Sequence, residues 1–504
     1  MDGVRFRWAF CQLDTLRRCM PSSIRKVLDE LPTTLDDTYE RALKEIPREQ
    51  RQHAHRLFQC LVVAIRPLRV EELAELFAID FDEDAGPNLK EGWRPEDPED
   101  AVLSACSTLI AVINNDNDDS GNGSDDGGDD GGDDDNDNDN DNHEGSKIVQ
   151  FSHFSVKEYL TSDRLRTSQI GHYHIPLDTA HTILVRACLT VLLQMDENVD
   201  RKRLETFPLA LYASQHWVDH AKYEDVASRI QDAMEQLFDP SKPYLAAWTW
   251  IYDVDSGRGG QTIYHLEERQ KQPEGATLYY AVLCGFSGLA NYLISTHGEN
   301  VNAKCGRHGT PLHAASYEGH LDAARLLLAH GVDVNTINQK KKTPLCSAYD
   351  GGHLDAMRLL LEHGADVEVH YNHNGGLLHD AWSQRGHADA IHLLLQHNAD
   401  VNARNSIDQT PLHLASMQGQ ARVAQILLEH RAIINAQDGV LCTPLYDASE
   451  KGHTEVVQVL LKHGADVHIR GSGNLTPFQV ATRQGHVEVA QLLLEHGAKK
   501  GIGR

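Results

Sequence analysis

The C-terminal half of this 504-residue chain repeats with a period of 33 residues. Thr-Pro-Leu or Thr-Pro-Phe begins at Thr310, Thr343, Thr410, Thr443 and Thr476. A glycine series from Gly319 to Gly485 and a series of Val-Asn type pairs share this period, with the same single-residue insertion near 382–385. Three markers with one period predict stacked copies of a small unit, because a unit this short cannot bury its apolar face alone.

Each repeat predicts two short helices joined by a turn. In the unit that starts at Thr310, the threonine hydroxyl caps a helix whose first position is Pro311, where no backbone N–H is needed. This helix is expected to end at Gly319, because glycine adopts the left-handed conformation readily. A second helix contains Leu326–Leu328, and an extended tip near Val334 leads to the next threonine.

The sequence Thr-Pro-Leu-His-Ala-Ala at 310–315 resembles the signature of the ankyrin repeat. The resemblance covers residues 277–500 and implies seven units, of which the first, near Thr277, is degenerate. It also implies an α-solenoid whose inner helices and tips form an extended surface for a protein partner.

The candidate partner-binding residues are those that differ between repeats, because residues fixed by the period serve packing. On the tips they are Lys304, Arg307, Lys340, Lys341, Lys342, Tyr371 and Arg404. On the inner helices they are Tyr317, Tyr349, Trp382, Met417 and Tyr446. Aromatic side chains dominate interface hot spots, and the basic tips predict a partner with an acidic surface. The alternative is that the lysines only keep an exposed tip soluble.

Thirty histidines raise the question of a metal site. His313, His379 and His413 share one repeat position, and His320, His353, His387, His453 and His486 share another. Recurrence at the repeat period favours helix packing and capping over metal binding. His-Glu-x-x-His does not occur in the sequence. We therefore expect neither a bound metal nor another cofactor.

Residues 21–165 predict helices followed by a β-hairpin, an order typical of a winged helix. Apolar residues at helical spacing mark helices over 35–46, 50–65, 70–77 and 101–109, and strands are expected over 110–113 and 148–151. Further helical patterns predict a helical connector over 166–276. Its tryptophans Trp217, Trp248 and Trp250 are expected in the core rather than at a ligand site.

Several N-terminal segments resemble the winged-helix region that follows NACHT-type nucleotide-binding domains in fungal NLR-like (STAND) proteins, often labelled a GPI inositol-deacylase-type winged helix. These segments are 28–32, 36–41, 66–68 and 151–160. The resemblance implies that residues 1–20 are the remnant of an NTPase-like domain. The predicted fold class is thus mainly α: a winged-helix plus helical module followed by an ankyrin-repeat α-solenoid.

The formal net charge of −27 argues against a general nucleic-acid binder, which needs Lys and Arg to neutralise phosphates. About half of this charge lies at 114–146, where thirteen aspartates and one glutamate occur without Lys or Arg. This composition predicts a disordered acidic insert in the hairpin turn. The calcium-loop alternative lacks the EF-hand spacing of glycine and glutamate. Val70–Phe77, taken as the recognition helix, holds three glutamates that would repel DNA.

The dipeptide Gly-Lys is absent from the sequence, so a phosphate-binding loop of the G-x-x-x-x-G-K-[ST] type is excluded. Nine scattered cysteines without a Cys-x-x-Cys pair predict a reducing compartment, and we expect a cytoplasmic protein. Apolar runs long enough to span a membrane do not occur.

These observations predict a non-enzymatic scaffold or sensor, the regulatory part of an NLR-like protein. Its partners would be proteins, and neither nucleic acid nor membrane is expected. The alternative is that the chain is a truncated form of a NACHT signalling NTPase whose P-loop domain lies upstream.

Overall fold

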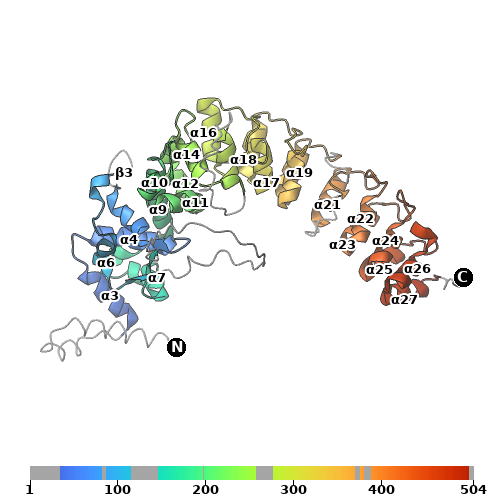
Figure 1. Cartoon of the computed structure of the whole chain (residues 1–504), viewed down its shortest axis with the longest axis horizontal. Coiled ribbons are helices and arrows are strands. Elements are labelled where there is room, and N and C mark those ends of the chain that lie inside the picture. The colour runs from blue at the N-terminus through green and yellow to red at the C-terminus, as the bar shows by residue number, and fades with distance from the viewer. Residues whose placement is uncertain are drawn as a thin grey trace, which may run out of the picture. The chain divides into compact units, whose positions relative to one another are not determined.

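The computed structural model of the chain describes residues 34–81, 87–114, 146–196, 198–256, 276–368, 375–379 and 388–498. These residues belong to two compact units, which divide between Gln270 and Lys271 and are both built mainly from helices (Figure 1). The mainly α fold class is therefore confirmed. The expected remnant at 1–20 and almost all of the acidic window at 114–146 lie outside the described residues, as do Tyr371 and Trp382.

The first part of the N-terminal unit combines short helices with a small sheet. Its elements are α3 (Leu35–Glu45), α4 (Arg51–Val63), β1 (Leu68–Arg69), α5 (Val70–Ala74), β2 (Ile79–Asp80), β3 (Asn88–Leu89), α6 (Pro98–Cys106), β4 (Ile110–Asn114), β5 (Lys147–Phe151) and α7 (Phe154–Leu160). The side chain of Thr34 starts α3 by accepting a hydrogen bond from the Asp37 N–H at 3.1 Å. Strands β1, β5 and β4 form one antiparallel sheet with β5 in the centre, and β2 pairs with β3.

The helix directly before the hairpin is α6, which corrects our assignment of Val70–Phe77 as the recognition helix. Within that segment α5 spans only five residues, and a 3₁₀ turn follows it. Glu72 and Glu75 are buried and form ion pairs with arginines, so these two carboxylates are not presented to a phosphate backbone. The first turn of α6 itself carries Glu99 and Asp100, which still disfavours DNA at this helix.

The hairpin is paired up to the residues that flank the acidic window. Ile110 lies opposite Phe151 at one end of the two strands, and Asn114 lies opposite Lys147 at the other. The expected strands are thus confirmed, each with one additional residue. Because Asn114 and Lys147 are already neighbours across the strands, the residues between them are not needed to set the register.

We expect that replacing residues 115–146 by Asn-Gly leaves the fold of the N-terminal unit intact. Two residues suffice to join directly opposed strands in a tight hairpin turn, and shortening a flexible loop changes its closure entropy by only about 0.6 kcal/mol per halving of its length. Going from 32 residues to two is four halvings, so the shortened chain should be more stable by at most about 2.4 kcal/mol. Urea unfolding should therefore give the same or a higher midpoint for the shortened chain. Loss of soluble protein, or specific stabilisation of the intact chain by Ca²⁺, would show instead that the insert is structural.

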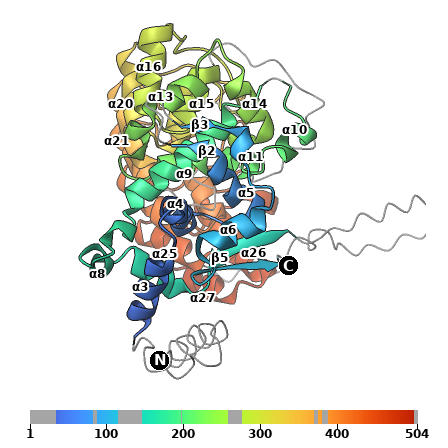
Figure 2. The ribbon, with the colours of Figure 1, turned by 90° about the vertical axis from the view of Figure 1, so that its left-hand side faces the viewer.

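The rest of the N-terminal unit is a set of helices packed on the first part. They are α8 (Asp163–Arg166), α9 (Leu177–Leu192), α10 (Arg201–Glu205), α11 (Ala210–Ala221), α12 (Val226–Arg229), α13 (Gln231–Leu237) and α14 (Tyr244–Ile251). Helix α9 packs against both α4 and α11 (Figure 2), so the expected winged-helix and connector segments share one compact unit. Trp217 and Trp248 are fully buried with ring centroids 5.3 Å apart, and the Trp248 Nε1–H donates to the Ser214 carbonyl. These two tryptophans therefore lie in the core, as expected.

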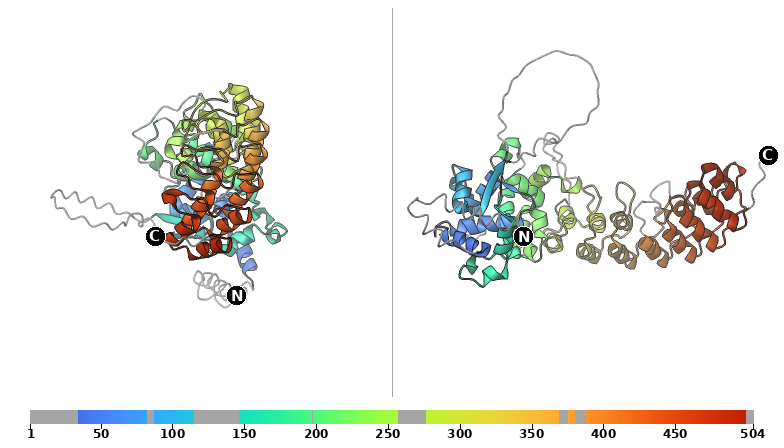
Figure 3. Two further views of the ribbon diagram at one scale, coloured as in Figure 1. Left: turned by 90° about the vertical axis from the view of Figure 1, so that its right-hand side faces the viewer. Right: turned by 90° about the horizontal axis from the view of Figure 1, so that it is seen from below.

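The C-terminal unit is a row of helix pairs (Figure 3). The inner helices are α15 (Ala276–Leu283), α17 (Pro311–Glu318), α19 (Pro344–Gly351), α22 (Pro411–Met417), α24 (Pro444–Lys451) and α26 (Pro477–Gln484). The outer helices are α16 (Ser287–His297), α18 (Leu321–Ala329), α20 (Leu354–Glu362), α21 (Ala388–Gln396), α23 (Ala421–Glu429), α25 (Thr454–Lys462) and α27 (Val487–Glu495). The expected threonine caps and helix-starting prolines are confirmed from α17 onward in the described inner helices.

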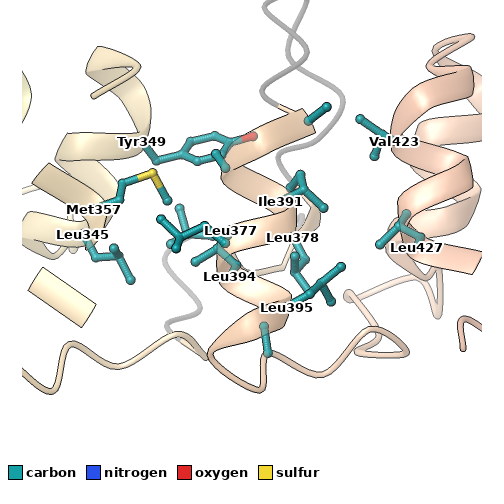
Figure 4. Packing of buried hydrophobic residues seen from close by; sticks show 14 of the residues in the cluster. Leu345, Tyr349, Met357, Leu377, Leu378, Ile391, Leu394, Leu395, Val423 and Leu427 are labelled. Atoms are coloured by element: carbon teal, nitrogen blue, oxygen red, sulfur yellow. The ribbon is translucent and has the colours of Figure 1, made fainter. Parts of the chain in front are cut away.

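One continuous hydrophobic core joins these repeats, from Leu278 in α15 to Leu493 in α27. Figure 4 shows the middle of this core, where Leu394 and Leu395 of α21 lie between Met357 of α20 and Leu427 of α23. Each repeat thus buries its apolar side chains against its neighbours, as the period predicts.

Candidate protein-binding surface

The recurring histidines form hydrogen bonds within a repeat and between neighbouring repeats. Nδ1 of His313 and of His413 bonds the hydroxyl of the preceding cap threonine at 2.8 Å. Nε2 of the same rings donates to carbonyls of the next repeat, Lys342 O at 2.9 Å and Cys442 O at 3.2 Å. Burial lowers the pKa of His313 to about 4, so the ring is neutral at pH 7. The interpretation of these histidines as packing and capping residues is confirmed.

The second histidine series joins repeats in the opposite direction. Nε2 of His320, His453 and His486 donates to the carbonyls of Leu283, Met417 and Glu450 at 3.1, 3.0 and 2.9 Å. Within the described ranges, no group of three or more His, Cys, Asp or Glu side chains is arranged to hold a metal ion. The histidine positions are therefore not candidates for the functional site.

The basic tip residues proposed from the sequence differ in how accessible they are. Lys304, Arg307, Lys340 and Lys341 are exposed. Lys342 is half-buried and pairs with Asp350 at 2.5 Å. Arg404 donates to the carbonyls of Asp408 at 3.0 Å and of Gln437 at 2.9 Å, which ties two successive tips together. Lys342 and Arg404 thus have structural partners, and the side chains of Lys304, Arg307, Lys340 and Lys341 are exposed.

The inner-helix candidates occupy different repeat positions and differ in how accessible they are. Tyr446 occupies the position of His413 and is 3% exposed, with its hydroxyl donating to the Ser472 carbonyl at 3.1 Å. Tyr349 lies at another position and is also 3% exposed. Both therefore pack inside the solenoid. Of the four inner-helix candidates that the structure describes, Tyr317 and Met417 are the two that are partly accessible, and both lie seven residues after their cap threonines.

An exposed apolar cluster on two successive tips escaped the sequence analysis. We call Ile407, Val440 and Leu441 the apolar tips; their exposed fractions are 58, 61 and 61%. Ile407 and Val440 each lie three residues before a cap threonine, and the Gly439 N–H donates to the Ile407 carbonyl at 3.0 Å between them. The run Gly-Val-Leu-Cys at 439–442 could have revealed this cluster in the sequence, because tips usually carry polar residues.

Leu441 adopts a backbone conformation that suits its side chain poorly. Its φ is +66°, and the equivalent positions of other tips are Lys341, Asp408 and Asn474 with φ of +59°, +61° and +60°. Asp and Asn tolerate this left-handed region, whereas a bulky apolar residue there costs about 1–2 kcal/mol. The chain thus holds an apolar side chain in solvent at an energetic cost, which is a feature of functional sites.

Asp447 of α24 is a buried carboxylate at a position that is uncharged in most other repeats. The equivalent residues are Ala314, Ser347, Asp380, Leu414 and Val480, of which Asp380 lies outside the described residues. Asp447 is 6% exposed, and among the described residues its Oδ2 has no hydrogen-bond partner. Burial raises the pKa of this carboxyl well above its usual range. Asp438 and Glu450 raise the pKa further, and Lys451 partly opposes them.

We expect Asp447→Asn to stabilise the protein at pH 8 by about 1–3 kcal/mol, the usual cost of a buried group without a partner. Because the folded state has the higher pKa, it binds more protons than the unfolded state above the unfolded pKa. The free energy of unfolding therefore falls as pH rises from about 4, and this fall should be smaller in the variant. Urea unfolding at pH 4.5, 6 and 8 tests this, with Glu455→Gln on the exposed face of α25 as control. A variant that is less stable at every pH contradicts it.

Comparisons with known proteins identify ankyrin repeats in the C-terminal unit and one curated relative over a longer stretch. The family profile described as "Ankyrin repeats (3 copies)" matches residues 278–371, 378–471 and 441–503. A curated protein of Monascus ruber, "Azaphilone pigments biosynthesis cluster protein L", is 29% identical over 313 residues, which are 60% of this chain. The chain likewise spans 60% of the length of that relative.

Solved ankyrin-repeat structures also match. The ankyrin repeat domain of human ASB11 is 28% identical, and the match covers 44% of this chain and 99% of that domain with a TM-score of 0.40. The corresponding values for the ankyrin repeat domain of Bcl-3 are 26%, 43%, 97% and 0.39. Among the described residues, no helix has the length and apolar character needed to cross a membrane.

Proposed function

We propose, from the ankyrin repeats that residues 278–503 contain, that this chain is a non-enzymatic interaction protein whose solenoid holds a partner protein. One observation carries the proposal. In the repeats whose inner helices are α17, α19, α22, α24 and α26, the position seven residues after the cap threonine is at least partly accessible, and its residue type changes along the solenoid. It holds Tyr317, Asp350, Met417, Glu450 and Arg483.

Packing between repeats does not require different residue types at the position seven residues after the cap threonine. The threonine, glycine and histidine positions repeat because they make the same caps and joints in successive units. A row of accessible side chains with different chemistry suits the recognition of one extended surface, since a partner is selected by complementary groups rather than by a common motif.

For the N-terminal unit we propose a winged helix with a regulatory role of the NLR-like kind. The order of α4, β1, α5, α6 and the β4–β5 hairpin supports it, together with the pairing of β1 to the last strand. We further propose a cytoplasmic location. We propose no NTPase activity for this chain, since the Gly-Lys of a phosphate-binding loop does not occur in its sequence. The acidic first turn of α6 supports a protein rather than a nucleic acid as partner.

The test is capture of a partner by the tagged full chain from an extract of the cells that produce it, followed by calorimetry with the purified partner. Met417→Glu and Arg483→Glu should each weaken binding at least tenfold, because each introduces a negative charge that the partner would cover without a compensating group. Gln458→Glu on the exposed face of α25 is the matched control and should bind normally. If no partner binds saturably, or both variants bind like the control, the proposed function is wrong.

A further inference from the structure

We propose that the tips before α17 and α19 receive an acidic segment of the partner protein, in which Asp or Glu residues flank an aliphatic or aromatic side chain. These tips are residues 302–309 and 336–342, which we call the basic tips. The inference rests on the proposed function and specifies the chemistry of the partner. It adds a contact region at one end of the row of accessible side chains that begins with Tyr317.

The first step is the charge of the basic tips. Their sequence contains five Lys or Arg residues and no Asp or Glu, in a chain whose formal net charge is −27. Lys342 forms an ion pair with an aspartate of α19. The other four side chains, Lys304, Arg307, Lys340 and Lys341, are exposed. The basic tips therefore present a local positive charge on an otherwise acidic chain.

The second step is that hydrogen bonds join the two tips into one surface. Nδ2 of Asn338 donates to the His308 carbonyl at 2.8 Å and connects the second tip to the first. A backbone hydrogen bond also closes each tip, from the Cys305 N–H to the Gly309 carbonyl at 2.7 Å and from the Asn338 N–H to the Lys342 carbonyl at 3.0 Å. The backbone segments that carry the cations are thus held together before a partner binds, so the partner does not need to order them.

The third step is the apolar contact area that the basic tips offer next to their cations. Ile337 directly precedes Asn338 and is 50% exposed. Its position is polar in the other described tips, where it holds Lys304, Arg404, Gln437 and Arg470. On the first tip, the ring of His308 packs on Tyr317 of α17 with ring centroids 4.4 Å apart, and both rings are partly accessible. A partner can therefore bury apolar side chains where it meets the cations.

Charge complementarity selects the occupant. A single exposed ion pair contributes little to binding, so a small anion would not be held, whereas several carboxylates on one segment meet four cations together. A nucleic acid would extend beyond the tips and would be repelled by the rest of a chain whose net charge is −27. An acidic peptide segment with an aliphatic or aromatic residue matches both the cations and the apolar area.

The probe is a library of random 12-residue peptides displayed on phage and selected on the immobilised full chain. Selected peptides should carry several Asp or Glu residues around an aliphatic or aromatic one. The peptide that binds most tightly is then synthesised with a fluorescent label, and its affinity is measured by anisotropy. This affinity should fall at least fivefold when NaCl is raised from about 50 to about 300 mM, because salt screens exposed charges.

Four variants locate the peptide on the chain. We expect Lys304→Glu and Lys340→Glu each to weaken binding at least fivefold, because each replaces an attraction by a repulsion. Ile337→Gln, which installs the residue type of Gln437 in another tip, should weaken it at least threefold. Arg358→Glu makes the same charge change on the exposed face of α20 and should change the affinity less than twofold. All four side chains are exposed, so urea midpoints close to that of the unmodified chain should show that weaker binding is not a result of unfolding.

Several results would overturn the inference. They are failure to select peptides, selection of peptides without acidic residues, and equal affinity for Lys304→Glu, Lys340→Glu and Arg358→Glu. Unchanged affinity of Ile337→Gln would overturn its apolar part. A labelled strand of 12 thymidine nucleotides that binds more tightly than the selected peptide would overturn it in favour of a nucleic acid.

The partner captured by the full chain separates this inference from the proposed function. A partner that responds to Met417→Glu but binds Lys304→Glu and Lys340→Glu normally would leave the proposed function standing and overturn the inference. Selection of the expected peptides without any captured protein would support the surface and count against the proposed function.

Discussion

Replacing Gly452 by alanine is expected to destabilise the solenoid by about 2–5 kcal/mol, whereas Gly464→Ala should cost only about 1–2 kcal/mol. Both glycines have a left-handed backbone, with φ of +78° and +88°, so both substitutions carry the same conformational cost. A Cβ on Gly452 would lie 2.5 Å from Nδ1 of His486, and a Cβ on Gly464 would meet no atom within 4 Å. The difference in unfolding free energy between the two variants therefore measures the close contact of Gly452 with His486, which connects two neighbouring repeats.

This joint also contains a hydrogen bond, because Nε2 of His486 donates to the Glu450 carbonyl at 2.9 Å. Displacing the ring would strain or break this bond and loosen the last repeat from its neighbour. Urea unfolding of the full chains should show the effect as a lower midpoint or as a separate early transition, since repeats are coupled only to their neighbours. Adding His486→Ala to Gly452→Ala should recover the steric part of the loss. Equal destabilisation by the two glycine variants would contradict the prediction.

Removing Arg66 is expected to destabilise the N-terminal unit by about 3–5 kcal/mol, the usual cost of leaving one member of a buried ion pair without its partner. Glu72 is fully buried and accepts two hydrogen bonds from the Arg66 guanidinium, at 2.8 and 2.6 Å, and one from the Arg69 N–H at 2.8 Å. These donors therefore stabilise the ionised form of the buried Glu72 carboxylate. Arg69 Nε also donates to this carboxylate at 3.1 Å, so Arg66→Ala would leave the buried anion with two of these four hydrogen bonds.

The pKa of Glu72 gives this prediction a pH dependence. Burial would raise this pKa, but the hydrogen bonds and charge of Arg66, together with Arg69, outweigh burial and lower it. The ionised carboxylate thus stabilises the folded state above the unfolded pKa of about 4.5, and this contribution is lost as pH falls through the folded pKa. The loss of unfolding free energy caused by Arg66→Ala should therefore be largest near pH 7.

The matched control is the exposed pair of Arg164 and Asp36, whose nitrogen and oxygen lie 2.6 Å apart. The Arg164 side chain is 70% exposed, so Arg164→Ala should cost less than about 1 kcal/mol. Thermal and urea unfolding of both variants compare the pairs directly. Similar losses for Arg66→Ala and Arg164→Ala would show that burial of Glu72 does not decide the strength of its interaction.

Sequence alone determined the architecture of the repeats, because the relevant signals are local and recur. A cap threonine, a proline at the first helical position and a glycine at the end act within one helix, and the structure confirms them, for example from Thr310 to Gly319. The periodic histidines were assigned to packing for the same reason. Recurrence at one position identifies a shared contact without showing its partner atoms.

Only the tertiary structure decided which side chains remain accessible, because burial depends on residues of neighbouring repeats. Tyr446 was expected at the surface and lies in the core because it takes the place of His413. Asp447 passed unnoticed among ordinary acidic residues until the packing of α22, α24 and α26 showed it buried and unsatisfied. In the N-terminal unit, Glu72 was read as a surface charge, and the fold places it beneath two arginines. The repeat period thus defines the scaffold, whereas the contacts between repeats define the surface that a partner meets.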